Sequence, residues 1–162
     1  MVVDEWRAAP MDELGRAAPV RLILGSSDSA VVAMTGLVVY STGLEFRCDI
    51  LLREPLRPDQ HIFPSFVPDA GPLLKLGVEF PHGGRATSLD DDPPHRSHPR
   101  GPVLRLGGSY SGGATRVVLT AWLWPLPGPG PLVLFCEWPD EGIAPTRCEL
   151  DSASIVHVGR PV

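Results

Sequence analysis

The chain has 162 residues, of which 43% are hydrophobic and 20% charged, a balance that suits one domain with a sizeable core. Its formal net charge of -5 offers no general attraction for phosphate backbones or anionic lipid, which argues against nucleic acid and membrane surfaces as partners. Because no run of about 18 apolar residues occurs and the acidic start MVVDEWR is unlike a signal peptide, we expect a single cytoplasmic domain over residues 1–162.

Period-two alternation of apolar and polar residues dominates after residue 18 and predicts half-buried strands. In GLEFRCDILLR, residues 43–53, one predicted inward face carries Leu44, Phe46, Cys48, Ile50 and Leu52. The opposite face, expected to meet water, carries Glu45, Arg47, Asp49 and Arg53. The preceding AVVAMTGLVVY is apolar on both faces, and Gly43 in the short connection can adopt positive φ. Residues 30–53 are therefore predicted to form one antiparallel hairpin.

Further strands are predicted at LLKLGVEF (73–80), PVLRL (102–106), RVVLTAWLW (116–124) and LVLFCEW (132–138). Gly83 and Gly84 close the first of these with a turn, and Pro139 ends the last. Residues 85–101 are polar and rich in proline, which predicts a mobile surface loop. A helical turn is predicted at MDELGRAA (11–18), and DSASIVHV (151–158) fits a helical turn or a strand. Seven or eight strands separated by glycine and proline turns predict an all-β, antiparallel β-sandwich.

The stretch WLWPLPGPGPLVLFCEWP, residues 122–139, concentrates tryptophan and proline between two strands. It fits a stiff connector that keeps these strands in register, or a polyproline ligand for an aromatic groove. It also fits an exposed patch of tryptophans on neighbouring strands. Under this last hypothesis the partner-binding residues are Trp122, Trp124, Pro125, Pro127 and Trp138.

The pieces TGLEFRCDILLR, GVEFPHGGRAT, GGSYSGG and WLWPLPGPGPLVLFCEWPDEGI resemble a family of small uncharacterised actinobacterial proteins. The similarity covers roughly residues 19–155, and its specific part is WPLPxPGPL...CEWPxxGI, here residues 124–132 and 136–143. The chain departs from the motif at Gly128, where the family usually has proline, and lacks the Ala- and Arg-rich C-terminal helix. The resemblance implies no catalytic residues, but it indicates that the tryptophan-proline stretch matters.

Few residues could take part in catalysis or bind a metal. The acidic cluster Glu137, Asp140 and Glu141 could perform acid and base chemistry if His82 or Arg85 from another turn joined it in a pocket. Asp90, Asp91, Asp92, His95 and His98 lie close in sequence, but the intervening prolines indicate adventitious metal affinity rather than a metal site. The three cysteines, Cys48, Cys136 and Cys148, lack CxxC spacing and are expected to be buried or half-buried thiols, of which the inward-facing Cys48 and Cys136 are inert. No phosphate-binding loop or nucleophile elbow is present, and no cofactor is expected.

Two functions remain after these exclusions. The first is a non-enzymatic β-sandwich module that binds an unidentified protein, or itself, through the tryptophan-proline residues. The alternative is a small-ligand binder or enzyme that uses the carboxylates of Glu137, Asp140 and Glu141. Neither nucleic acid nor membrane is expected as a partner.

Overall fold

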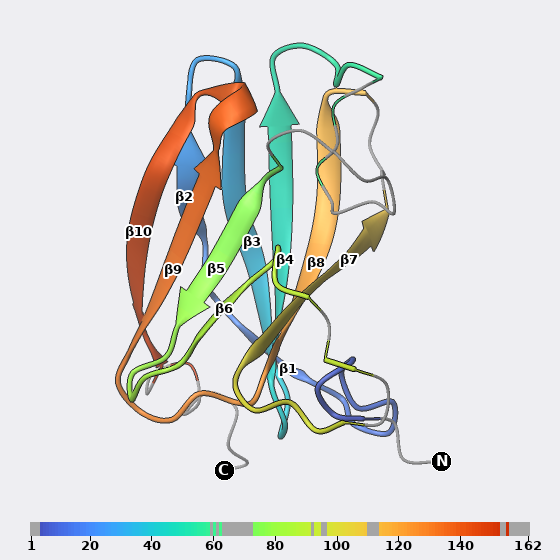
Figure 1. The fold of residues 1–162 in the computed structure, drawn as a ribbon, viewed down its shortest axis with the longest axis vertical. Coiled ribbons are helices and arrows are strands. Elements are labelled where there is room, and N and C mark those ends of the chain that lie inside the picture. Colours follow the sequence, from blue (N-terminus) through green and yellow to red (C-terminus); the bar gives the residue numbers. More distant parts are fainter. Residues whose placement is uncertain are drawn as a thin grey trace.

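The computed structural model describes residues 4–58, 60, 62, 73–91, 93–94, 97–109, 114–152 and 155. These residues form two antiparallel sheets that pack face to face (Figure 1). The large sheet contains β1 (Arg16–Ala18), β2 (Leu22–Ser26), β3 (Ala30–Val39), β4 (Leu44–Leu52), β7 (Val103–Ser109) and β8 (Arg116–Trp124). The small sheet contains β5 (Lys75–Glu79), β6 (Arg85–Thr87), β9 (Pro131–Trp138) and β10 (Ile143–Asp151), and a short 3-10 turn, η1 (Pro139–Glu141), joins its last two strands. The predicted all-β antiparallel sandwich is confirmed.

The large sheet has the order β1-β3-β4-β8-β7, and β2 also pairs with β3. β1 pairs with the second half of β3 and β2 with the first half, so the two short strands follow one another along the same edge. The small sheet has the order β10-β9-β5-β6. The predicted hairpin of residues 30–53 is confirmed, because β3 pairs with β4 along almost its whole length.

The core lies between the sheets, where alternate residues of each strand face inward. The predicted inward faces of β4, β5, β8 and β9 are confirmed, and their buried residues join one cluster with Val32, Met34 and Leu37 of β3. This cluster contains Cys48 and Cys136, as the alternation indicated.

The predicted strand count of seven or eight was too low, since ten strands are described. The helical turn expected at residues 11–18 was wrong, because Arg16–Ala18 forms β1 against β3. The loop expected at 85–101 was wrong for its first three residues, which form β6 against β5. Of the ambiguous stretch 151–158, Asp151 ends β10, while residues 153–154 and 156–158 lie outside the described residues.

Two glycine predictions had different outcomes. Gly83 and Gly84 adopt φ of 93° and 96°, as a turn between β5 and β6 requires. Gly43 does not adopt positive φ; a Cβ there would lie 2.3 Å from the carbonyl oxygen of Leu123. The close approach of β8, and not a turn conformation, therefore explains why residue 43 is a glycine. The described residues include no helix long and apolar enough to cross a membrane.

Candidate functional site

The three tryptophans of the predicted binding patch do not share an exposed face. Trp138 lies on the inner face of β9 with 0% exposure, and its Nε1 has no partner among the described residues. Trp122 lies on the outer face of β8 but is only 6% exposed. Trp124 is half-buried, and its ring meets that of His98 edge-on at 5.3 Å between centroids. The hypothesis of an exposed tryptophan patch is therefore wrong.

Trp122 lies under residues 4–18, which we call the N-terminal strap, and against Tyr40, whose ring meets it edge-on at 5.8 Å between centroids. Its Nε1 donates a hydrogen bond to the Glu5 carbonyl at 3.0 Å. Trp6 of the strap is buried, with the Arg7 guanidinium 4.6 Å and that of Arg105 5.7 Å from its ring. Arg105, on β7, also donates to the Arg7 carbonyl at 2.8 Å. The strap thus closes over one end of the large sheet.

The prolines after Trp124 belong to a fixed connector between β8 and β9. Pro125 is half-buried and Pro127 is buried. The hydroxyl of buried Ser152 donates to the Gly130 carbonyl at 2.7 Å, and the Ser152 amide donates to the same oxygen at 2.9 Å. These contacts match the stiff-connector interpretation better than a free polyproline ridge.

The three carboxylates of the alternative site have different surroundings. Glu137 lies on the outer face of β9 beside Lys75, Asp140 is exposed, and the Glu141 carboxylate accepts from Ser29 Oγ at 2.6 Å and from Gln60 Nε2 at 2.5 Å. His82 and Arg85 are at the other end of the small sheet, because β5 runs antiparallel to β9 from Lys75 opposite Glu137 to Glu79 opposite Val133.

Arg85 has a different role from the one predicted. Its guanidinium lies 4.3 Å from the centre of the Phe135 ring and 4.0 Å from the Glu79 carboxylate. Arg147 completes this group with an ion pair to Glu79 at 2.7 Å. Arg85 therefore covers Phe135 on the outer face of the small sheet and pairs with Glu79, and the predicted pocket of His82 or Arg85 with the three carboxylates does not form.

The described residues contain no group of three or more potential metal ligands. The Asp90 carboxylate accepts instead from the amide and hydroxyl of Thr87 at 2.8 and 2.9 Å. Asp92 and His95 lie outside the described residues.

Burial raises the pKa of the Cys48 and Cys136 thiols to about 12, with neighbouring thiols and carboxylates adding to the shift. Both thiols are accordingly poor nucleophiles at neutral pH.

The outer face of the large sheet carries an apolar surface that the sequence analysis missed. Five side chains form it, and we call them the apolar face: Ile23, Val31, Ala33, Leu51 and Val118. The strand register joins them in two adjacent rows, one from Ile23 through Ala33 and Asp49 to Val118, the other from Val31 to Leu51. Ile23 is 64% exposed and Leu51 49% exposed.

Asp49 is buried within this face, although the alternation predicted that it would meet water. It is 6% exposed and accepts hydrogen bonds from Thr35 Oγ1 at 2.5 Å and from Arg116 at 2.8 and 3.2 Å. The Thr35 hydroxyl, followed by Arg116 and Arg47, holds the pKa of the carboxyl below its usual value against the opposing effect of burial. The charge is thus matched locally, and the apolar side chains around it remain available to a partner.

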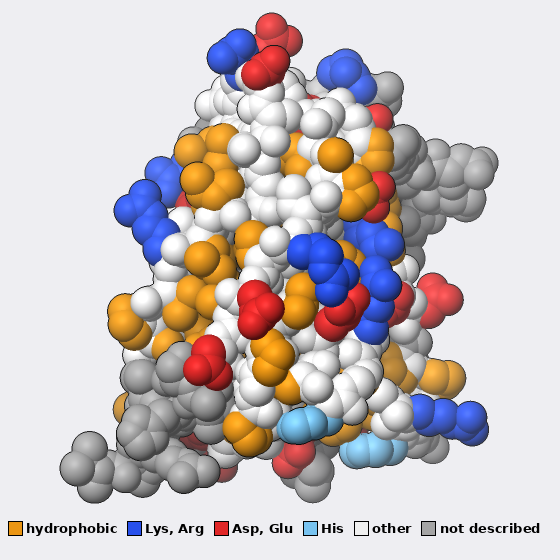
Figure 2. Space-filling model, turned by 90° about the vertical axis from the view of Figure 1, so that its left-hand side faces the viewer, with side chains coloured by type: hydrophobic (Ala, Val, Ile, Leu, Met, Phe, Trp, Pro, Cys, Tyr) orange, Lys and Arg blue, Asp and Glu red, His pale blue; other side chains and the backbone are white. Residues whose placement is uncertain are grey.

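Viewed from the side of β2 and β10, hydrophobic side chains run down one half of the surface (Figure 2). Charged side chains of both signs are mixed over the other half, and Lys or Arg side chains also project at the margin of the hydrophobic half. The sequence signal for the apolar surface was weak: AVVAMTGLVVY is apolar on both faces, a pattern that also fits a strand buried on both sides.

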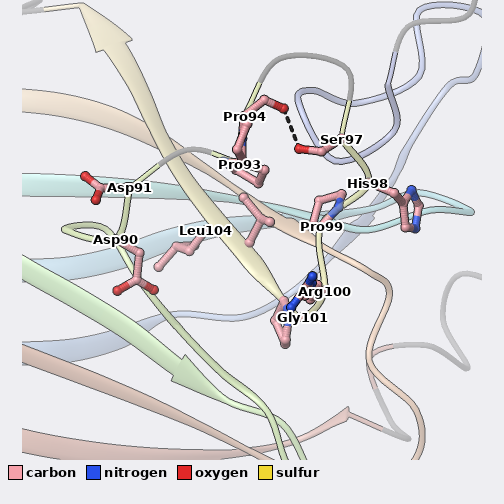
Figure 3. Close-up of a pocket in the computed structure, with 12 residues that line it drawn as sticks. Asp90, Asp91, Pro93, Pro94, Ser97, His98, Pro99, Arg100, Gly101 and Leu104 are labelled. Atoms are coloured by element: carbon pink, nitrogen blue, oxygen red, sulfur yellow. Dashed lines mark hydrogen bonds between the residues drawn. The ribbon is translucent and has the colours of Figure 1, made fainter.

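A hollow of about 520 Å³ opens at the edge of the sandwich beside the start of β7 (Figure 3). Leu104, a core residue of β7, forms part of its lining together with four prolines, Pro93, Pro94, Pro99 and Pro102. Asp90 and Asp91 lie on one side of the hollow and His98 and Arg100 toward the other. A hollow of this size accommodates a small ligand or the side chains of a protein partner.

Comparisons of the chain with protein-family models, with curated proteins and with solved structures gave no match. The assignment of function therefore rests on the geometry of the described surfaces.

Proposed function

We propose that this chain is a non-enzymatic β-sandwich module that binds another protein through its apolar face. The observation that carries the proposal is the exposure of Ile23 and Leu51, at 64% and 49%, with Val31 and Ala33 between them in the strand register. The outer face of an antiparallel sheet that meets water is normally polar. Contiguous apolar side chains on such a face are typical of a protein interaction surface.

A comparison of the apolar face with the part of the sheet under the strap supports this proposal. The strap contacts Trp122 at one end of the large sheet through the Glu5 carbonyl and is held there by buried Trp6 and by the bond from Arg105 to the Arg7 carbonyl. The apolar face lies farther along the same strands, on the rows that contain Asp49 and Leu51. The chain thus shields the tryptophan of this outer face but leaves the aliphatic side chains open.

The surroundings of the apolar face indicate the chemistry of the partner. The side chains of Arg47 and Arg116 are 56% and 50% exposed, and Asp49 balances only one of these two charges. Arg53 is exposed just beyond the end of β4. A partner with an apolar centre and an acidic rim would complement this surface, because charge at the rim steers association and apolar contacts at the centre hold the complex.

The tryptophan-proline residues have a supporting role in this proposal. Trp124 and Pro125 are half-buried where β8 passes into the connector, and in this proposal they are not the binding surface. A cytoplasmic location and membership of the actinobacterial family that the motif resembles remain part of the same proposal. Both are supported by composition and sequence motif alone.

The test compares wild type with the double variant Ile23→Ser and Leu51→Ser as immobilised bait in lysate of the source cells. Both side chains are exposed, so the variant is expected to keep the wild-type melting temperature within a few degrees. A specific partner should be captured by wild type, released as salt is raised, and retained about tenfold less by the variant. Met11→Ser with Leu14→Ser, which removes two exposed apolar side chains elsewhere, is the matched control.

Two results would reject the proposal. One is capture of the same proteins in the same amounts by wild type and by the Ile23 and Leu51 variant. The other is loss of the partner with the control variant alone, which would move the binding surface to the strap.

A further inference from the structure

The strap presents two apolar side chains to solvent in a fixed position. Met11 is 90% exposed and Leu14 is 95% exposed. The segment that carries them is anchored at both ends, by buried Trp6 before it and by the pairing of β1 with β3 after it. Between these anchors, the Glu13 carboxylate accepts from the amide and hydroxyl of Ser41 at 2.7 and 2.5 Å. Met11 and Leu14 are therefore held outward by the surrounding contacts, where another surface can cover them.

The hollow beside β7 has a suitable lining for such side chains. Leu104 and the proline rings supply apolar contact, and its volume of about 520 Å³ exceeds the space that two aliphatic side chains fill. The strap of the same copy does not fill it, since Met11 and Leu14 are almost fully exposed.

The charges around these two features are complementary. On the strap, Asp12 follows Met11 directly, and Arg16 lies two residues after Leu14; both are exposed. At the hollow, Arg100 and Asp91 lie toward different sides (Figure 3). A strap docked with Asp12 near Arg100 and Arg16 near Asp91 would place each charge against its opposite. Such an arrangement selects one orientation of the docked segment.

The strap and residues 97–102, which line the hollow, lie at the same end of the molecule, next to the start of β7 (Figure 1). Arg105 of β7 contacts the strap through the Arg7 carbonyl, while the adjacent Leu104 lines the hollow on the other face of the strand. A two-fold axis between two copies can therefore place each strap at the hollow of the other, the reciprocal arrangement of an isologous dimer.

We propose that the chain forms a homodimer in which Met11 and Leu14 of each copy enter the hollow beside β7 of the other. This dimer uses a surface separate from the apolar face, so it goes beyond the proposed binding function and can be tested independently.

The experiment is sedimentation velocity of the purified full chain over a dilution series. Wild type should show a reversible monomer-dimer equilibrium, and Met11→Ser with Leu14→Ser should raise the dimer dissociation constant by about tenfold or more. Because these side chains are 90% and 95% exposed, the melting point of the monomer should not change. Asp91→Arg should also weaken the dimer, and adding Arg16→Asp should restore it.

The control is the Ile23→Ser and Leu51→Ser variant, which should dimerise like wild type. The proposal is overturned if wild type is monomeric throughout the series, or if the Met11 and Leu14 variant dimerises unchanged. It is equally overturned if the charge swap gives no recovery. Loss of the dimer in the control variant alone would also overturn it, because self-association would then occur through the apolar face. The apolar face would remain a binding surface.

Discussion

Replacement of Asp49 by asparagine tests how the large sheet tolerates a buried charge on its outer face. The carboxylate accepts one hydrogen bond from Thr35 and two from Arg116, and Arg47 lies 3.7 Å away. A hydrogen bond to a charged group contributes about 1.5 to 3 kcal/mol. Both arginines are half exposed, so solvent screens their bonds to Asp49 and each contributes less than this range indicates. Asparagine keeps one acceptor, so we expect Asp49→Asn to lower the free energy of unfolding by about 2 kcal/mol at pH 7.

The pH dependence gives the sharper test. Because the folded-state pKa of Asp49 is lowered, its stabilisation is fully present above the pKa of the unfolded chain, about 3.9, and is lost as pH falls through the folded-state value. The difference in unfolding free energy between wild type and Asp49→Asn should be constant near neutral pH and shrink below about pH 4. Urea denaturation at a series of pH values measures it.

Thr35→Val is the matched control, since it removes one donor and keeps the charge; we expect a loss of about 1 kcal/mol at neutral pH. A wild-type advantage over Asp49→Asn that is the same at pH 3 and pH 7 would refute the electrostatic reasoning. So would a difference under about 0.5 kcal/mol at pH 7, which would mean that solvent screens the pair as it does on an open surface.

Three further outcomes test the packing. Trp138→Ala, at a fully buried position, should cost about 3 to 5 kcal/mol in urea denaturation; a cost under about 1 kcal/mol would contradict its place in the core. Gly43→Ala should cost about 1 to 3 kcal/mol, because its Cβ would meet a backbone carbonyl of β8; unchanged stability would disprove that close contact. Cys148, which is half-buried, should react with a thiol reagent in the native protein before Cys48 and Cys136, as mass spectrometry of labelled peptides would show; equal rates would contradict the burial and raised pKa of the latter two.

The fold class could be predicted because each long strand carries its own pattern. In β4 most apolar residues repeat every second position, and this period selects one buried face whatever the partner strand is. The short strands β1 and β6 have three residues each, too few to show a period. They form because longer neighbours, β3 and β5, offer them a backbone to pair with.

The candidate site could not be predicted in the same way. Trp122 of β8 and Trp138 of β9 lie on strands of similar composition. Trp138 is buried in the core, whereas Trp122 is buried on the outer face under the strap. The carboxylates of Glu137 and Glu141 are close in sequence to each other but far from His82, because β5 and β9 run antiparallel with the turns at opposite ends. The apolar face combines residues of four strands, and no single segment indicates it.

The sequence by itself thus determined the β-sandwich and the inward faces of its main strands, since alternation is a local property of each chain segment. Tertiary structure alone decided which outward residues meet water. Asp49 is buried on an outer face by side chains of β3 and β8, Trp122 by a strap from the N-terminus, while Ile23 and Leu51 remain exposed. The exposure of an outward side chain depends on what the rest of the chain lays over it, and that covering comes from segments distant in sequence.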